Sequence, residues 1–230
     1  MRRHAWAVTL AKRIDLSLLS ELVLASASPR REELLARLKL PFRVRPVGVE
    51  ERVPIEGNIE IISRRLARIK AEAARLVDTG PVIIAADTVV AVDRAILGKP
   101  VDAADARRML ELLRAREHEV VSAVAVMRAG GRSALVRQPV TRVMMRDYAD
   151  TEINASIARR DPFDKAGAYA IQDEAFRPVE RYDGCYCNVV GLSLWATIEL
   201  LRKADVKVSA VSQSDLLPQC ALCPLRPRAS

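Results

Sequence analysis

Pro81-Val-Ile-Ile-Ala-Ala-Asp-Thr88 is the stretch that decides the fold of this chain. Residues 81–86 form a continuous apolar run of strand length, as expected for a strand covered on both faces. The polar pair Asp87-Thr88 follows at once, and residues 89–92 are typical of a second strand. We therefore expect a buried strand that ends at a polar pair.

Segments on both sides of this strand alternate between strand and helix. Residues 22–25 are typical of a short strand, Ser28 and Pro29 suit the start of a helix, and Asn58 suits the cap of a helix to about residue 77. The remaining expected elements are an extended segment at 42–49, a helix at 102–113, strands at 120–127 and 134–145 joined through Gly130-Gly131, a helix at 151–158, a loop at 161–167 and a helix at 189–201. Such alternation favours an α/β fold.

The pattern predicts one domain over residues 21–203, with an N-terminal extension at 1–20 and a loosely ordered tail at 204–230. Half of the 230 residues are apolar, which is enough for one large domain or two small lobes. After residue 204 the sequence changes to Ser, Pro and isolated apolar residues, which indicates a loosely held segment.

The formal net charge of +8 comes mainly from the two ends of the chain. Residues 1–20 and 201–230 together hold nine Lys or Arg and three Asp, so the totals of 37 and 29 leave 28 against 26, or +2, for residues 21–200. A nearly neutral body with 4% aromatic residues does not favour nucleic-acid binding. No apolar run approaches the ~20 residues that cross a membrane, so we expect no membrane partner.

Cysteines occur in two close pairs, Cys185/Cys187 and Cys220/Cys223. Four are too few for a disulfide scaffold in a chain of this length, which favours a reducing, cytoplasmic location. The second pair reads Cys-Ala-Leu-Cys, but no other Cys or His lies near it in the sequence to complete a four-ligand zinc site. Reactive or incidental thiols are the favoured interpretation, and structural zinc is the alternative.

Ser26-Ala-Ser-Pro-Arg30-Arg31 leads from a strand directly into a helix. The free backbone N–H groups and the positive end of the helix dipole suit a phosphate there. Arg30 and Arg31 add guanidinium groups that can bind two phosphate oxygens at once. An ordinary capped helix with solvated arginines explains the same residues.

Acidic residues follow two extended segments, as Glu50-Glu51 and as Asp87 before Thr88. A carboxylate at the end of a buried strand needs a cation, a proton or hydrogen-bond donors. Carboxylate oxygens favour Mg²⁺ or Mn²⁺, and these ions usually accompany a polyphosphate. The alternative is that Asp87 only caps a turn.

Gly98-Lys99-Pro100 has the composition of a loop in which glycine permits close approach and Lys99 offers a positive charge. Lys70 and Lys165 could join it in the folded chain, although ordinary turn chemistry also explains this loop. The sequence has no Walker loop, dinucleotide fingerprint or nucleophile elbow.

Together, these segments resemble the Maf family of nucleoside triphosphate pyrophosphatases. Eight segments match in the family's order over residues 21 to about 200: Leu24-Ala-Ser-Ala-Ser-Pro-Arg-Arg31, Glu50-Glu51, Arg68-Ile-Lys-Ala71, Ala86-Asp-Thr-Val-Val90, Ile96-Leu-Gly-Lys-Pro100, His118-Glu-Val120, Asp164-Lys-Ala-Gly-Ala-Tyr-Ala-Ile-Gln172 and Asn188-Val-Val-Gly-Leu192. Each is weakly specific alone, but eight in order over most of the chain are a strong signal.

The resemblance implies an α/β fold similar to that of the ITP pyrophosphatases, with an elongated mixed sheet flanked by helices, two lobes around a cleft and often a homodimer. It implies hydrolysis of a nucleoside triphosphate to the monophosphate and pyrophosphate with Mg²⁺ or Mn²⁺ as cofactor. In that family, a Thr after this Asp goes with dTTP and UTP, so the resemblance at Thr88 implies these two substrates, with modified pyrimidine nucleotides as further candidates.

Site roles carry over to the matched positions. The resemblance implies that the catalytic residues are Asp87, Glu51 and Lys99, with Asp87 as the base for the attacking water. The implied metal ligands are Asp87 and Glu51. The implied substrate-binding residues are Ser28, Arg30, Arg31, Lys70, Thr88, Lys165 and Gln172.

Several positions depart from the family pattern without removing an expected metal or phosphate residue. They are Gly48 in place of an acid, Glu50 in place of Asp, Arg114-Ala115 in place of Ser-Gly, Ser122-Ala123 in place of Thr-Gly, and Ser193 in place of Pro. A nucleotide-binding regulator of septum formation, acting through a partner, is the alternative function that the family suggests. The intact set of carboxylates and lysines disfavours it, since a scaffold has no need for buried charge.

Overall fold

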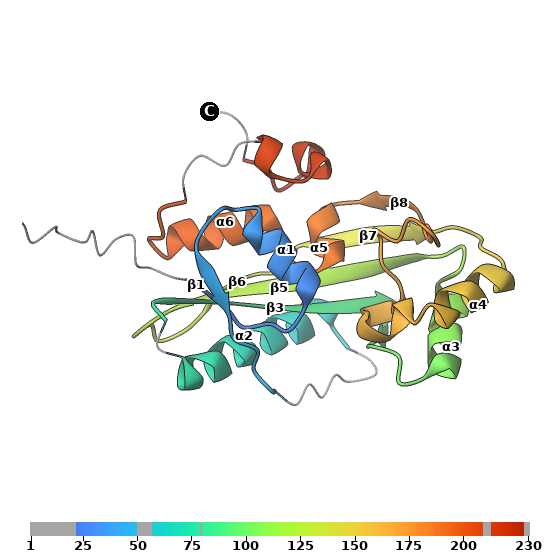
Figure 1. Cartoon of the computed structure of the whole chain (residues 1–230), viewed down its shortest axis with the longest axis horizontal. Helices are drawn as coiled ribbons and strands as arrows, with labels where there is room; N and C mark the ends of the chain where they lie inside the picture. The colour runs from blue at the N-terminus through green and yellow to red at the C-terminus, as the bar shows by residue number, and fades with distance from the viewer. Residues whose placement is uncertain (1–21, 50–56, 79, 209–212, 228–230) are drawn as a thin grey trace, which may run out of the picture.

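The computed structural model describes residues 22–49, 57–78, 80–208 and 213–227, and it has an elongated shape (Figure 1). Its strands are β1 (Leu22–Leu24), β2 (Phe42–Val44), β3 (Val82–Val92), β4 (Ala95–Leu97), β5 (Glu117–Arg128), β6 (Leu135–Arg137), β7 (Val140–Met145) and β8 (Val179–Asp183). Its α-helices are α1 (Pro29–Ala36), α2 (Ile59–Val77), α3 (Ala103–Leu113), α4 (Asp150–Ala158), α5 (Tyr186–Val190) and α6 (Leu194–Lys203). Short 3-10 helices are η2 (Asp161–Asp164), η3 (Ala166–Ala168), η4 (Gln213–Asp215) and η5 (Pro218–Leu222).

All eight strands belong to one mixed sheet in the order β2-β1-β3-β5-β7-β8, with β4 beside β3 and β6 beside β5. β1 runs parallel to β2 and β3, whereas β3, β5, β7 and β8 pair antiparallel in succession. The sequence prediction of an α/β fold with a mixed sheet flanked by helices is confirmed.

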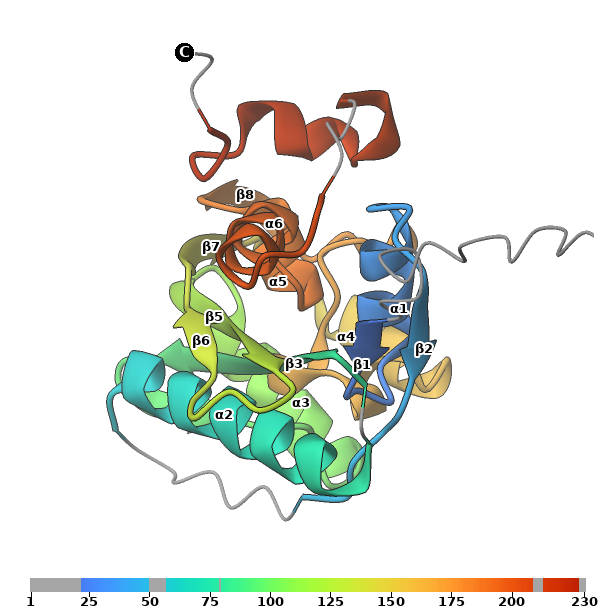
Figure 2. The same cartoon turned by 90° about the vertical axis from the view of Figure 1, so that its left-hand side faces the viewer.

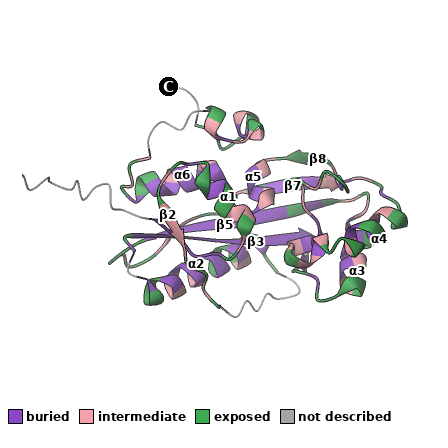
Figure 3. Cartoon of the chain, in the orientation of Figure 1, coloured by how far each residue is buried: buried purple, intermediate pink, exposed green. Residues whose placement is uncertain are grey.

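Helices cover both faces of the sheet because successive strand residues point to opposite sides. Leu24 and Ile84 pack in one core with Ile198 of α6, whereas Val23 and Ile83 pack in another with small residues of α2. Figure 2 shows α2 on one face and α5 and α6 on the other. The burial map shows that the central strands are almost entirely enclosed (Figure 3).

A second lobe forms at the other end of the long strands. There β3, β5 and β7 pack with α3, α4 and η3 around a core that includes Leu110, Val143, Tyr148 and Ile153. Figure 1 shows α3 and α4 at the end of the molecule opposite to β1 and α6. β3 runs through both lobes, so its centre lies between them.

The edge of β3 is open at that centre. β1 pairs with residues 82–84 of β3 and β4 pairs with residues 90–92, while β5 pairs with residues 82–91 on the opposite edge. The last hydrogen bond on the β1 side joins the Ala25 N–H to the Ile84 carbonyl at 2.8 Å. Among the described residues, no strand pairs with residues 85–89 on this edge, which leaves a gap in the sheet.

One central expectation from the sequence is wrong. Asp87 and Thr88 do not end a strand, because β3 continues unbroken from Val82 to Val92. A charged residue normally argues against a buried strand. Here the ammonium group of Lys70, on α2, forms an ion pair with Asp87 and compensates its charge.

Other boundaries also differ. The extended segment predicted at 42–49 is a strand only over Phe42–Val44, and the strand predicted at 134–145 is split into β6 and β7. The helix predicted at 189–201 is split into α5 and α6, because Gly191 takes a φ of +130° and Ser193 caps a new helix through the Ala196 N–H.

The predicted helix starts are largely correct. The Asn58 side chain accepts the Ile61 N–H at 3.0 Å, and Asp102 accepts the Asp105 N–H at 2.8 Å. Ser28 does occupy the cap position of α1, but its hydroxyl makes no capping hydrogen bond. The Ser28 hydroxyl therefore does not cap the backbone N–H groups of α1.

The segment predicted as a loosely ordered tail contains packed residues where it is described. Leu216, Cys220 and Cys223 are buried in the same core as Leu194 and Ile198 of α6. Figure 2 shows the two short helices of this segment next to α6. Separately, none of the helices in the described ranges is long and apolar enough to cross a membrane.

Candidate active site

A cleft of about 570 Å³ opens at the gap in the edge of β3. It lies between the two lobes and is bordered by residues from α1, α2, the centre of β3, the loop after β4, η2, η3 and the end of α5. Nine residues expected from the sequence line it: Ser28, Arg30, Arg31, Lys70, Asp87, Thr88, Lys99, Lys165 and Gln172. The tenth, Glu51, lies outside the described residues together with Glu50.

Asp87 is the buried acid of the cleft. Its side chain is 6% exposed and that of Lys70 is 9% exposed, and the Lys70 Nζ donates a hydrogen bond to Asp87 Oδ1. Burying an unpaired charge costs several kcal/mol, so each residue stabilises the other in place. The pair positions one carboxylate against the floor of the cleft.

Thr88 lies on the opposite face of β3 and joins α1 to the sheet. Arg31 Nη2 donates to Thr88 Oγ1 at 3.0 Å, and Thr88 Oγ1 lies 2.7 Å from Ser122 Oγ. Ser122 Oγ donates in turn to the Asn188 carbonyl at 2.6 Å. Because the carbonyl can only accept, the Thr88 hydroxyl must donate to Ser122, and the hydrogen bonds run in one direction from Arg31 to Asn188.

Arg31 is fixed at a second point by Gly191. Its Nε donates to the Gly191 carbonyl at 3.0 Å, just beyond the last turn of α5. Gly191 has a φ of +130°, which disfavours any side chain. The guanidinium group of Arg31 is therefore held along the wall of the cleft by two separate elements.

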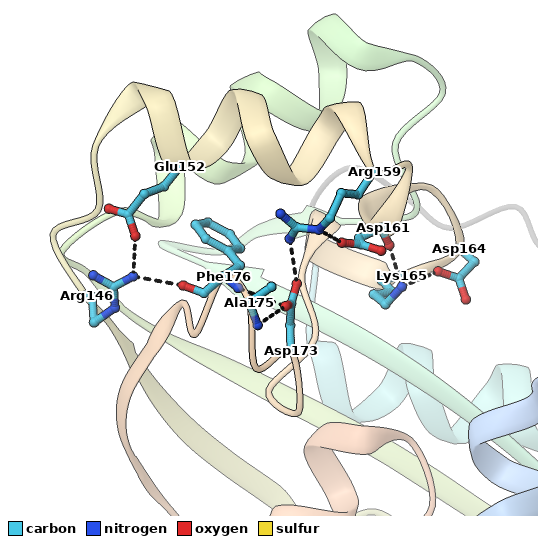
Figure 4. Close-up of polar contacts among 9 residues, drawn as sticks. All are labelled: Arg146, Glu152, Arg159, Asp161, Asp164, Lys165, Asp173, Ala175 and Phe176. Carbon is cyan, nitrogen blue, oxygen red and sulfur yellow. Dashed lines mark hydrogen bonds and ion pairs between the residues drawn. The ribbon is translucent and has the colours of Figure 1, made fainter.

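Arg30 and Lys165 meet at Asp164 on the other wall. Arg30 Nη1 lies 2.6 Å from Asp164 Oδ2, and Lys165 Nζ lies 2.6 Å from Asp164 Oδ1. Burial raises the pKa of Asp164 most strongly, yet hydrogen bonds from Lys165 and Arg30 together hold it below its ordinary value. Figure 4 shows Lys165 between Asp161 and Asp164, on the loop after α4.

Lys99 and Gln172 are exposed and border the mouth of the cleft. The loop that carries Lys99 is tied to the second lobe, since the Gly98 carbonyl accepts the Gly167 N–H at 3.0 Å. This hydrogen bond links the loop of Lys99 to the segment that carries Lys165. Both lysines line the same cleft as Arg30 and Arg31 of α1.

Positive charge dominates this cleft. Among its described lining residues there are five cationic side chains, from Arg30, Arg31, Lys70, Lys99 and Lys165, against the carboxylates of Asp87 and Asp164. The difference, 5 − 2, is +3. Such a cleft suits a small polyanion, and the buried Asp87 carboxylate would lie beside an anion that bound there.

Residues 21–204 match the model of the Maf family, described as Maf-like protein. That match covers most of the chain. The chain belongs to the Maf-like protein family.

Two relatives illustrate the sequence similarity. The dTTP/UTP pyrophosphatase of Thermomicrobium roseum is 52% identical over 207 residues, which cover 90% of this chain and 94% of the relative. The dTTP/UTP pyrophosphatase of Citrifermentans bemidjiense is 46% identical over 184 residues, covering 80% and 95%. Among solved structures, the Staphylococcus aureus Ham1 protein matches with a TM-score of 0.40 and 18% identity, covering 55% of this chain and 72% of that chain.

Asn188 belongs to a matched Maf segment, but the sequence assigned it no role. It is fully buried, its Oδ1 accepts the Ser122 N–H at 2.8 Å, and its Nδ2 donates to the Val120 carbonyl at 2.8 Å and to Thr141 Oγ1 at 2.9 Å. These bonds attach α5 to β5 and β7. An Asn within this otherwise mostly apolar segment was the feature of the sequence that could have indicated a buried, hydrogen-bonded side chain.

Ser122 and Tyr169 were also missed as parts of this Maf-like site. Ser122 stands where the family pattern has Thr, and in this structure its hydroxyl contacts both the Thr88 hydroxyl and the Asn188 carbonyl. Tyr169 lines the cleft, and its hydroxyl lies 2.7 Å from His118 Nε2 behind it. Burial lowers the pKa of His118 to about 4, so this histidine is neutral near pH 7.

Proposed function

We propose that this chain hydrolyses nucleoside triphosphates, dTTP and UTP first, to the monophosphate and pyrophosphate. The observation that carries the proposal is the buried Asp87 beside a row of cations in one cleft. The relatives named dTTP/UTP pyrophosphatase give the substrate class and the bond that is cleaved.

Substrate binding would depend on the cations of both walls. Arg30 and Arg31 from one wall, with Lys99 and Lys165 from the other, would surround the triphosphate. The Asp164 side chain is 57% exposed in its ion pair with Arg30, so a phosphate group could replace this carboxylate as the partner of Arg30. The Ser28 hydroxyl and the Gln172 amide would supply further hydrogen bonds.

Asp87 would act as the base. Attack of water on the α-phosphorus breaks the bond between the α-phosphorus and the oxygen that bridges to the β-phosphate, so the oxygen of the water ends on the monophosphate and pyrophosphate leaves. The carboxylate of Asp87 would orient that water and accept its proton, while Lys70 maintains the position of the carboxylate. Arginine and lysine side chains would stabilise the charge that develops on the leaving pyrophosphate.

The donor chemistry of this cleft fits Mg²⁺ or Mn²⁺. Asp87 offers a hard carboxylate oxygen, and such ions often take one or two carboxylates plus substrate phosphates. No group of three or more His, Cys, Asp or Glu side chains in the described ranges is arranged to hold a metal ion. Asp87 and Glu51 are the residues that would hold the ion, and it would withdraw charge from the phosphate oxygens when bound.

Thr88 would contribute to specificity indirectly. Its hydroxyl forms hydrogen bonds with Arg31 and Ser122, which supports a role in positioning Arg31 rather than a direct contact with the nucleobase of the substrate. The proposed preference for pyrimidine nucleotides is therefore supported by the names of the relatives and not by a contact in the cleft. The names of the relatives offer no support for a regulator of septum formation.

A product assay tests the proposal. The full chain is incubated with ordinary and modified nucleoside triphosphates in turn, with Mg²⁺ or Mn²⁺, and pyrophosphate and orthophosphate are measured separately. We expect pyrophosphate and the monophosphate in equal amounts, with dTTP and UTP turned over fastest. Release of orthophosphate alone, or no turnover of any nucleotide, would refute it.

A further inference from the structure

All four cysteines of this chain meet at one place outside the cleft. Cys185 precedes the first turn of α5 and Cys187 lies within that turn, whereas Cys220 and Cys223 lie in and just after η5. The four residues are between 1% and 7% exposed and belong to one core. None of them is in a disulfide.

The sulfur atoms of the two pairs are in contact. Cys187 Sγ lies 3.3 Å from Cys220 Sγ, although 33 residues separate them in the chain. Cys185 interacts with both Cys187 and Cys223 through side-chain hydrogen bonds. Thus each cysteine of the first pair has a partner in the second.

A thiolate, rather than a thiol, is the form of cysteine that binds metals, so zinc would bind this cluster with loss of the thiol protons.

We infer that Cys185, Cys187, Cys220 and Cys223 form a tetrathiolate site for Zn²⁺ that attaches the C-terminal segment to α5. The two pairs have the spacings Cys-x-Cys and Cys-x-x-Cys, and four cysteines are a complete ligand set for structural zinc. With Zn–S bonds of about 2.3 Å, neighbouring sulfurs of a tetrahedral site lie roughly 3.8 Å apart. The contact between Cys187 and Cys220 is already close to that separation.

Binding requires a small rearrangement. In this structure the four sulfur atoms are not arranged around a common point. Among the described residues, no group of three or more His, Cys, Asp or Glu side chains is placed to hold a metal ion. Loss of the thiol protons removes the hydrogen bonds that hold the sulfurs in their present orientations. Rotation of the cysteine side chains would then direct them to one ion, with release of up to four protons.

The site would be distinct from the cleft in chemistry and in purpose. Four soft thiolates select Zn²⁺, whereas the carboxylate of Asp87 suits a hard ion such as Mg²⁺. The zinc site would fix the first turn of α5, and the other end of that helix carries Val190 and then Gly191 into the wall of the cleft. Metal binding would thereby stabilise the support of Arg31.

Metal analysis of the full chain tests this inference without any nucleotide. The protein is expressed with added zinc, dialysed against a weak chelator and analysed by mass spectrometry for metals, with about one Zn²⁺ per chain expected. Cys223→Ser should lose the ion, and Asp87→Asn should keep it as the matched control. Replacement by Co²⁺ should give the absorption bands of a tetrahedral thiolate complex, which decides the matter even if the cysteine variant fails to fold.

Two results would overturn the inference. One is wild-type protein that contains no zinc and takes up no Co²⁺ in the tetrahedral form. The other is a disulfide between Cys187 and Cys220, detected as only two titratable thiols in denatured, metal-free protein. Either result would leave the proposed hydrolysis of nucleotides untouched, because that reaction depends on the cleft.

Discussion

Lys70 and Asp87 form an ion pair between α2 and the centre of β3, and their side chains are only 9% and 6% exposed. This pair explains how an acid can occupy the middle of a buried strand. It also places a carboxylate in the central part of β3. On the cleft side, no strand of the described structure pairs with that part.

Replacing Lys70 should affect stability far more than replacing Lys99. Lys70→Met leaves a buried carboxylate without its ammonium partner, which should lower the free energy of unfolding by about 3–5 kcal/mol. Lys99→Met, at an exposed position, should change it by less than about 0.5 kcal/mol. Urea unfolding at pH 7 measures both, and equal losses would contradict burial of the pair.

The same two variants separate stability from activity. Because Lys99 is expected to stabilise the leaving pyrophosphate, Lys99→Met should reduce kcat/KM for dTTP by roughly ten- to a hundredfold while leaving the fold intact. Steady-state kinetics below the unfolding temperature would measure this. Normal kcat/KM in the Lys99 variant would exclude that lysine from the site.

Thr88→Val should weaken substrate binding through Arg31. The change removes the hydroxyl between Arg31 and Ser122 while keeping the branched shape, so it should raise KM more than it lowers kcat and cost about 1–3 kcal/mol of stability. Thr88→Ser retains the hydroxyl and is the matched control. In a double-mutant cycle with Arg31→Lys, strictly additive losses would show that the two residues are not coupled.

His118 should make the protein less stable in mild acid. Its pKa is lowered from 6.5 to about 4 by burial, so between these values the unfolded chain binds a proton that the folded chain does not. Stability should therefore fall as pH decreases from 6.5, by at most about 1.4 kcal/mol per pH unit.

The matched variant for this effect is His118→Gln, whose side-chain amide can still form a hydrogen bond with the Tyr169 hydroxyl, as donor or as acceptor. Its unfolding free energy should be flatter between pH 6.5 and 5 than that of the wild type. Parallel curves for the two proteins would show that His118 does not carry the pH dependence.

Much of the polar lining of the cleft could be predicted from the sequence because its residues stand in short, ordered motifs. Nine of the ten expected residues line one cleft, and the tenth, Glu51, lies outside the described ranges. The position of Asp87 within its strand could not be predicted, since the compensating charge of Lys70 comes from a separate helix. Local patterns contain no information about such a pairing.

Side-chain hydrogen bonds and contacts between distant segments could not be predicted from the sequence either. Thr88 reads as a substrate contact in the sequence, but the structure engages its hydroxyl with Arg31 and Ser122. The Cys220/Cys223 pair lacked zinc ligands nearby in sequence, whereas folding brings Cys187 into contact with Cys220. Both depend on how α5 packs, which single-sequence periodicity does not specify.

Pyrophosphate release from dTTP by Asp87→Asn, compared with wild type and with the exposed control Asp147→Asn, tests the central claim most directly. Removing the carboxylate should lower kcat by about 10²- to 10⁴-fold. The amide oxygen can still accept a hydrogen bond from Lys70, so the variant should fold, although with a lower free energy of unfolding than the wild type. Asp147→Asn should retain wild-type turnover. A folded Asp87→Asn protein that releases pyrophosphate at a near-normal rate would contradict the assignment of Asp87 as the base.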